Sequence, residues 1–268
     1  MEPNRQQERK FLQVNNPAFR EDAFDAGAVP AAEASTVNGA IGKTLFLLML
    51  VLMTGVIGYA IPNIGIAIGC IIGTIVLGFV IGFKPHLAPS VSPVYALAQG
   101  YAVGVISFAI NRAIGASIAE RGGRGGASLI FNNAIPAAIL GTALTVGVML
   151  FLYKAQIIKV TETFKAVVLG ATAAVFLLYL VVLALVFFVP SLQQMGIFRP
   201  TLTGILFSVL VIAIAAFNLI LDFHWIDEAA AKRLPKYYEW YVGFGLMVTI
   251  VWLYVEILKL IWKLSARR

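Results

Sequence analysis

The stretch Asn218–Lys263 reads NLILDFHWIDEAAAKRLPKYYEWYVGFGLMVTIVWLYVEILKLIWK. Its first apolar run ends in an acid, Asp222, a charged hairpin follows, and a second apolar run carries another acid, Glu256. Carboxylates at membrane depth are costly, and where they occur they generally serve a function. Asp222 and Glu256 are therefore the first candidate site residues, whereas the acids of the hairpin, such as Asp227 and Glu239, are expected on a face in contact with water.

The composition predicts a polytopic membrane protein. The 268 residues are 60% hydrophobic and only 12% charged, with a mean hydropathy of +0.90, whereas soluble domains carry about 25% charged residues. The net charge is +7, but Lys and Arg gather at the ends of apolar runs, where they anchor helices. They form no basic stripe interleaved with aromatic residues, so nucleic acid is not an expected partner. Cys70 is the only cysteine, which excludes an internal disulfide and a cysteine-rich metal site.

Seven apolar runs approach or exceed the roughly 20 residues that a membrane-spanning helix needs. They cover about 43–61, 64–83, 94–114, 129–153, 164–189, 201–223 and 241–264, and Thr161 is a candidate N-cap for the fifth. The predicted fold is an all-α integral membrane protein, with a seven-helix transmembrane domain over 43–268. Residues 1–42 are polar and mixed in charge, which predicts a disordered or loosely ordered tail.

The distribution of basic residues predicts the orientation. Of the 20 Lys and Arg residues, 12 fall on the side of the tail and 8 on the other side. Because cytoplasmic loops are the more basic, the N-terminus is expected to be cytoplasmic, in the plasma (inner) membrane of the cell.

Small and polar residues within the early runs suggest helix packing. The second run carries Gly65, Gly69 and Gly73 at a four-residue spacing, which places them on one face where a neighbouring helix can approach closely. Gln99 lies beside Gly100 in the third run. A glutamine at this depth needs a partner, so Gln99 either hydrogen-bonds across helices or lines a polar pathway.

Several segments resemble the Bax inhibitor family, in its bacterial YccA-like branch. They are NNPAF (residues 15–19), YKAQIIKVT (153–161), NLILDF (218–223) and LPKYYEWYVGFGLMVTIVWLYVEILKLI (234–261). The resemblance implies a bundle in which six helices surround a central last helix. It also implies a pH-sensitive calcium leak, in which an acid at the end of the sixth span and an acid in the last helix share a proton when closed and repel each other when ionised.

By position, Asp222 and Glu256 correspond to these two acids, as pH-sensing and gating residues and as ligands for calcium. Glu stands where the family usually has Asp. Asp222 lies 13 residues before Pro235 and Glu256 lies 21 after it, a mismatch of eight residues or about 12 Å along a helix. The alternative is that Asp222 is an interfacial residue at a helix end and that Glu256 pairs with Lys259 one turn on.

Two functions follow from these observations. The first is a calcium-permeable, pH-sensitive leak channel or transporter in the lipid bilayer, with calcium as the permeant or bound ion and no other cofactor. The alternative is a regulator that does not transport but binds a membrane protease or another stress-response partner. An enzyme is not expected, because the chain has no HExxH, GxSxG or paired-aspartate motif and its two histidines, His86 and His224, lie far apart in sequence.

Overall fold

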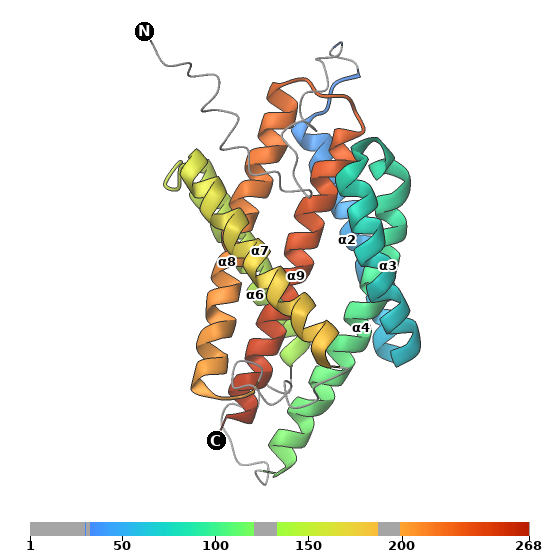
Figure 1. The fold of residues 1–268 in the computed structure, drawn as a ribbon, viewed down its shortest axis with the longest axis vertical. Helices are drawn as coiled ribbons and strands as arrows, with labels where there is room; N and C mark the ends of the chain where they lie inside the picture. The colour runs from blue at the N-terminus through green and yellow to red at the C-terminus, as the bar shows by residue number, and fades with distance from the viewer. Residues whose placement is uncertain (1–29, 31–32, 121–132, 187–198, 268) are drawn as a thin grey trace.

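The computed structural model describes residues 30, 33–120, 133–186 and 199–267 (Figure 1). Residues 1–29, 31 and 32 of the predicted tail, and the NNPAF segment within them, lie outside the described residues. Residues 37–42, which the sequence assigns to the tail, are instead the first turns of a helix, so the boundary predicted at 43 is six residues too late. Within the described residues, seven helices are long and apolar enough to cross a membrane, which confirms the predicted all-α membrane fold. Their bounds are α2 Val37–Ala60, α3 Ile64–Phe83, α4 Ala88–Glu120, α6 Ala134–Lys154, α7 Glu162–Val186, α8 Leu202–Ala231 and α9 Tyr238–Ala266, with a short 3₁₀ helix, η3 Pro85–Leu87, before α4.

Polar side chains cap the helices where the apolar runs begin. The hydroxyl oxygen of Thr36 accepts from the Gly39 N–H at the start of α2, and the side chain of Asn63 accepts from Ile66 at the start of α3. The predicted cap at Thr161 is confirmed, because its hydroxyl oxygen accepts from the Phe164 N–H at 3.2 Å. Such caps satisfy backbone donors that the first turn of a helix leaves free.

Helix α8 runs well past the point at which its apolar run ends. The sequence predicts a span ending near Phe223, but the helix continues to Ala231. The segment after Asp222 contains no glycine or proline and ends in three alanines, which favour helix. The helix ends where Arg233 adopts a positive φ of 51° and Pro235 follows, so the hairpin between α8 and α9 is shorter than expected.

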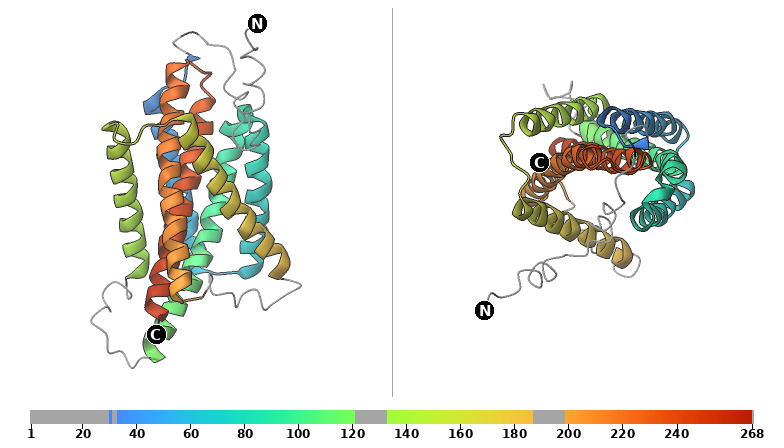
Figure 2. Two further views of the ribbon diagram at one scale, coloured as in Figure 1. Left: turned by 60° about the vertical axis from the view of Figure 1, so that its left-hand side comes forward. Right: turned by 90° about the horizontal axis from the view of Figure 1, so that it is seen from above.

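Helix α9 lies in the middle of the bundle. It packs directly on α8, α4, α2 and α6, and the view from above in Figure 2 shows these helices around it. Helix α3 packs mainly on α4, and α7 packs mainly on α8. The core includes Leu246, Met247, Leu253 and Leu258 of α9, all of them buried.

Glycines bring α2 and α4 into backbone contact. A Cβ atom at Gly104 of α4 would overlap the carbonyl oxygen of Gly55, and one at Gly58 of α2 would overlap the carbonyl oxygen of Tyr101. The glycine face predicted for α3 is different. No atom of another described helix lies within 4 Å of the position of a Cβ at Gly69 or Gly73, so the prediction that these two pack against a neighbouring helix is wrong for the described chain.

Glu239 joins the start of α9 to the start of α2. The sequence places it on a solvated face, but this is wrong, because only 2% of Glu239 is exposed. Its carboxylate accepts hydrogen bonds from the backbone N–H of Thr36 at 3.1 Å and from the Thr36 hydroxyl at 3.0 Å. The carboxylate therefore lies at the N-terminus of α2 and in the first turn of α9, where two helix dipoles favour negative charge.

Replacing Glu239 is expected to destabilise the bundle in proportion to what is removed. Glu239→Ala removes the one oxygen that accepts both hydrogen bonds from Thr36, and the loss of two hydrogen bonds costs about 2 kcal/mol. Glu239→Gln keeps an acceptor oxygen and loses only the charge, which costs about 0.5 kcal/mol. Thermal unfolding of the purified protein in detergent measures both. Equal losses for the two variants would show that charge, and not hydrogen bonding, holds the contact.

Candidate functional site

Asp222 is buried between α8 and α9. It is 6% exposed, and it faces α9 at Gly245 and Thr249. A Cβ at Gly245 would lie 3.6 Å from Oδ1 of Asp222, an ordinary van der Waals distance, so the carboxylate packs closely against α9 at this residue. The Thr249 hydroxyl donates to the Gly245 carbonyl at 3.2 Å and lies beside the Asp222 side chain. The other carboxylate oxygen, Oδ2, is buried and has no hydrogen-bond partner among the described residues.

Glu256 is buried more deeply, and one of its two carboxylate oxygens accepts several hydrogen bonds. It is 1% exposed, and three donors reach the same oxygen, Oε1. These are Lys259 Nζ at 2.6 Å, the Tyr179 hydroxyl at 3.1 Å and Trp252 Nε1 at 3.3 Å. The part of the alternative in which Glu256 pairs with Lys259 one turn on is therefore confirmed. The part that places Asp222 at a helix end is wrong, because α8 continues to Ala231 and Asp222 is buried.

The two acids lie at different levels of the bundle. Asp222 faces residues 245 and 249 of α9, whereas Glu256 lies seven residues beyond Thr249. At the rise of a helix that is about 10 Å. Each acid also has its own set of contacts, with no residue shared between the two sets. The structure therefore brings both acids into the same helix interface but does not join them as one carboxyl pair.

Further polar contacts line the interface of α7, α8 and α9 above and below these acids. The Asn218 amide donates to the Thr172 hydroxyl at 2.6 Å, between α8 and α7. Lys263 of α9 is buried and donates to the Gly204 carbonyl and to the Ser208 hydroxyl, each at 2.9 Å. We name this set the polar column. It consists of Thr172 and Tyr179 of α7, Ser208, Asn218 and Asp222 of α8, and Thr249, Glu256, Lys259 and Lys263 of α9.

Most residues of the polar column were not predicted from the sequence, although the spacing of those on α9 could have indicated them. Trp252, Glu256, Lys259 and Lys263 follow one another at intervals of four, three and four residues. This spacing places them on one face of a helix, so the α9 part could have been found from the sequence. Tyr179 could not, because its partner lies 77 residues away in the chain.

The remaining polar residues that the sequence singled out lie outside the polar column. Gln99 is half-buried in α4, and no hydrogen bond joins its side chain to another described residue. It therefore does not bond across helices there, and its role in a polar pathway stays a prediction. His224 lies 3.4 Å from Glu228, and Tyr153 donates to Asp227 at 2.8 Å. These contacts belong to the last turns of α8, near the hairpin.

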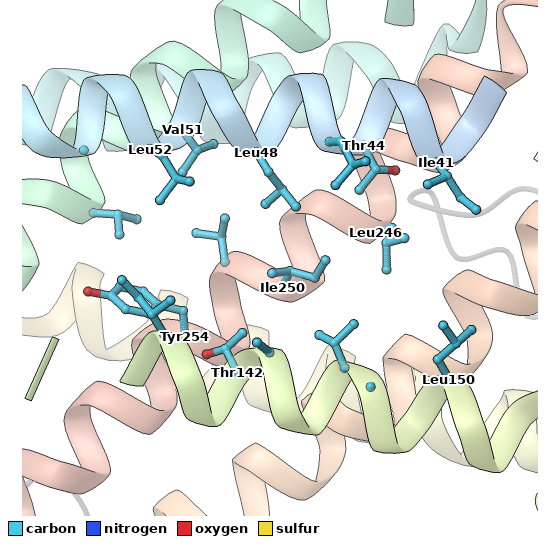
Figure 3. A pocket seen from close by; sticks show the side chains of 18 of the residues that line it. Ile41, Thr44, Leu48, Val51, Leu52, Thr142, Leu150, Leu246, Ile250 and Tyr254 are labelled. Carbon is cyan, nitrogen blue, oxygen red and sulfur yellow. The ribbon is translucent and has the colours of Figure 1, made fainter. Parts of the chain in front are cut away.

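A separate groove of about 900 Å³ lies on the other side of the last helix, between α2 and α6. Figure 3 shows Leu48 and Leu52 of α2 facing it from one side and Leu150 of α6 from the other, with Ile250 of α9 behind. Its lining is mostly aliphatic, and neither Asp222 nor Glu256 contributes to it. A hard cation needs oxygen ligands, so the polar column, and not this groove, is the candidate site.

The donors of the polar column do not form a ready-made metal centre. Within the described residues, no group of three or more His, Cys, Asp and Glu side chains lies close enough to hold a metal ion. The column instead presents one carboxylate from α8, Asp222, and one from α9, Glu256, at different levels, together with the ammonium groups of Lys259 and Lys263.

Comparison with known proteins gives one match. No curated protein and no solved structure matches the chain. A family model described as Bax inhibitor 1 like matches residues 16–266, which include all seven helices and both candidate acids. The chain belongs to the Bax inhibitor 1-like family.

Proposed function

We propose that this protein is a pH-sensitive, calcium-permeable leak channel or transporter. The observation that supports it most is Asp222, a carboxylate buried at membrane depth with no hydrogen-bond partner on one of its oxygens among the described residues. A buried polar group without a partner costs stability, and an acid within a membrane span is by default a functional group. The family to which the chain belongs is one for which such a leak is expected.

The proposed gate works through the charge on Asp222. With a proton bound, the carboxyl group is neutral and stays packed against Gly245 and Thr249. When the proton leaves, a charge forms in a site of low dielectric, where it is strongly unfavourable unless water or a cation enters. Its oxygens then suit calcium, a hard cation that takes oxygen ligands. Separation of α8 from α9 would connect Asp222 with the rest of the polar column.

Glu256 takes a different role from Asp222 in this proposal. Its carboxylate contacts the Lys259 ammonium group at 2.6 Å and lies about 10 Å along α9 from the level of Asp222, so the two acids are too far apart to share a proton. The pH response is assigned to Asp222, and Glu256 is assigned to the cation path. The family resemblance implies one acid pair that shares a proton. In this proposal the two acids instead act separately, at two successive levels along α9.

Calcium flux into proteoliposomes tests the proposed function. The purified protein is reconstituted with a calcium-sensitive dye inside, and influx is followed at pH 6 and at pH 8. Influx is expected to exceed that of protein-free vesicles and to be faster at pH 8, where more of the Asp222 carboxyl groups are ionised. Absence of influx at both pH values, with the protein folded and inserted, would refute the leak.

A second candidate is a regulator that binds another membrane protein, as expected for a YccA-like branch of the family. It is favoured by the open face at Gly69 and Gly73 of α3, which no atom of another described helix approaches and which suits close packing with a partner helix. Replacing both glycines with leucine should abolish co-purification of a membrane protease or another partner while leaving calcium influx unchanged. Loss of influx with retention of the partner would contradict this candidate.

We also propose that the N-terminus is cytoplasmic, in the plasma (inner) membrane. Cysteine labelling of intact cells tests it in a variant that lacks the native Cys70. A cysteine in place of Lys159, between α6 and α7, should be protected from a membrane-impermeant thiol reagent. One in place of Arg199, before α8, should react. The reverse pattern would invert the topology.

A further inference from the structure

We propose that Lys259 is a tethered cation that occupies a divalent-cation site at Glu256, so that the chain blocks its own pathway at this point. The inference rests on the proposed function, since it assigns Glu256 to the path of the ion. Lys259 is then the residue that determines specificity, and the ligands of the site are divalent cations such as calcium. The site becomes available when the Lys259 side chain leaves it.

The groups around the Lys259 ammonium group would stabilise any cation at that position. Lys259 Nζ lies 2.6 Å from Glu256 Oε1 and 3.2 Å from the Tyr179 hydroxyl oxygen. It also lies 4.7 Å from the centre of the Tyr179 ring, whose face attracts positive charge. A carboxylate, a neutral oxygen and a π face therefore converge on one point, between α9 and α7. Calcium binds oxygen at about 2.3–2.6 Å. An ion at the position of Nζ would therefore reach the Glu256 oxygen, and it would bind the Tyr179 oxygen after a shift toward α7.

Lys259 differs from the acid in its freedom to move. The Lys259 side chain is 29% exposed, whereas that of Glu256 is 2% exposed. Glu256 is also held by Tyr179 and by Trp252, so it would stay in place if the ammonium group left. A lysine on a flexible stem can withdraw, and the buried carboxylate would then need another positive charge.

Other charges near this point limit how tightly an ion can bind. Lys263 lies close enough to interact electrostatically with both Glu256 and Lys259, and it is buried, with bonds to Gly204 and Ser208. Its positive charge opposes a second cation. With one carboxylate and one hydroxyl from the protein, water must complete the coordination of calcium. The expected affinity is therefore weak, on the order of millimolar.

The test compares Lys259→Met with Lys259→Arg, which keeps the positive charge. Thermal unfolding of each purified protein is measured with and without about 10 mM calcium. Calcium should raise the Tm of Lys259→Met by about 3 °C, as expected for a ligand at about ten times its Kd. It should not raise the Tm of Lys259→Arg or of the double variant Glu256→Gln/Lys259→Met. Calcium influx at pH 8 should rise by at least about fivefold in Lys259→Met.

The outcomes separate this inference from the proposed function. If calcium raises the Tm of Lys259→Met and of neither other variant, the cation site is supported. This holds even if the wild type carries no calcium flux, a result that would refute only the proposed leak. If the wild type leaks but calcium does not stabilise Lys259→Met, the tethered cation is refuted and Lys259 is a structural partner of Glu256. Should Lys259→Met fold poorly, recovery of its folding by calcium supports the site, and recovery only by the added Glu256→Gln change refutes it.

Discussion

Gly104→Ala is expected to destabilise the protein by about 2 kcal/mol and to lower its Tm by about 6 °C. The reason is the backbone contact between α2 and α4. A Cβ at this position would overlap the carbonyl oxygen of Gly55 and would lie 2.9 Å from the backbone nitrogen of Tyr59. No side chain can rotate to relieve this overlap, because the atoms in the way are backbone. The two helices would have to separate along their contact.

The matched control is Gly69→Ala, the same change in a neighbouring helix. No atom of another described helix lies within 4 Å of a Cβ at Gly69, and alanine favours helix over glycine by about 1 kcal/mol. Gly69→Ala is therefore expected to be neutral or slightly stabilising. Thermal unfolding in detergent measures both variants. If both lower the Tm equally, the loss reflects glycine flexibility within the membrane, and the close contact of α2 with α4 is not what holds them together.

The number and order of the helices were predictable from the sequence because a membrane restricts the choice of structure, but several bounds were not. The span predicted over 94–114 is part of a longer helix, α4 Ala88–Glu120, which contains Pro93. Every backbone polar group in the hydrocarbon must be satisfied within its own segment, so apolar length defines a helix. Helix α3 runs over Ile64–Phe83 as predicted. The C-terminal end of α8 could not be predicted from apolar length, because its last turns carry charged side chains. A helix tolerates such side chains where it extends out of the membrane.

The surroundings of the acids were less predictable, because they depend on which helices meet. The sequence places Glu239 in a solvated hairpin, but its partner Thr36 lies 203 residues away in sequence.

Counting residues from the hairpin did predict that Asp222 and Glu256 lie at different levels along the helix axes. Asp222 lies 13 residues before Pro235, so its counterpart is expected near residue 248, and the structure places it against Gly245 and Thr249. The tyrosine from α7 that reaches Glu256 has no comparable signal in the sequence.

Asp222→Asn is expected to abolish the pH dependence of calcium influx. Asparagine has nearly the shape of the protonated carboxyl group and cannot ionise, so it should hold α8 against α9 at every pH. Influx gated by one proton can change by at most about tenfold per pH unit, or about 100-fold between pH 6 and pH 8. In Asp222→Asn the ratio should fall to about one, with influx at pH 8 reduced to the wild-type level at pH 6.

The control for Asp222→Asn is Asp227→Asn, which removes an acid five residues later on the same helix. Asp227 is partly exposed and already has partners, the Tyr153 hydroxyl at 2.8 Å and Lys154 at 3.6 Å. Its replacement should leave the pH ratio unchanged, because a paired carboxylate near the hairpin does not face the polar column. Asp222→Glu should retain a pH response, since it keeps a titrating group. If Asp222→Asn keeps the wild-type ratio while Asp227→Asn loses it, the gate lies at the hairpin, with His224 and Glu228 near it, and not at the buried carboxylate.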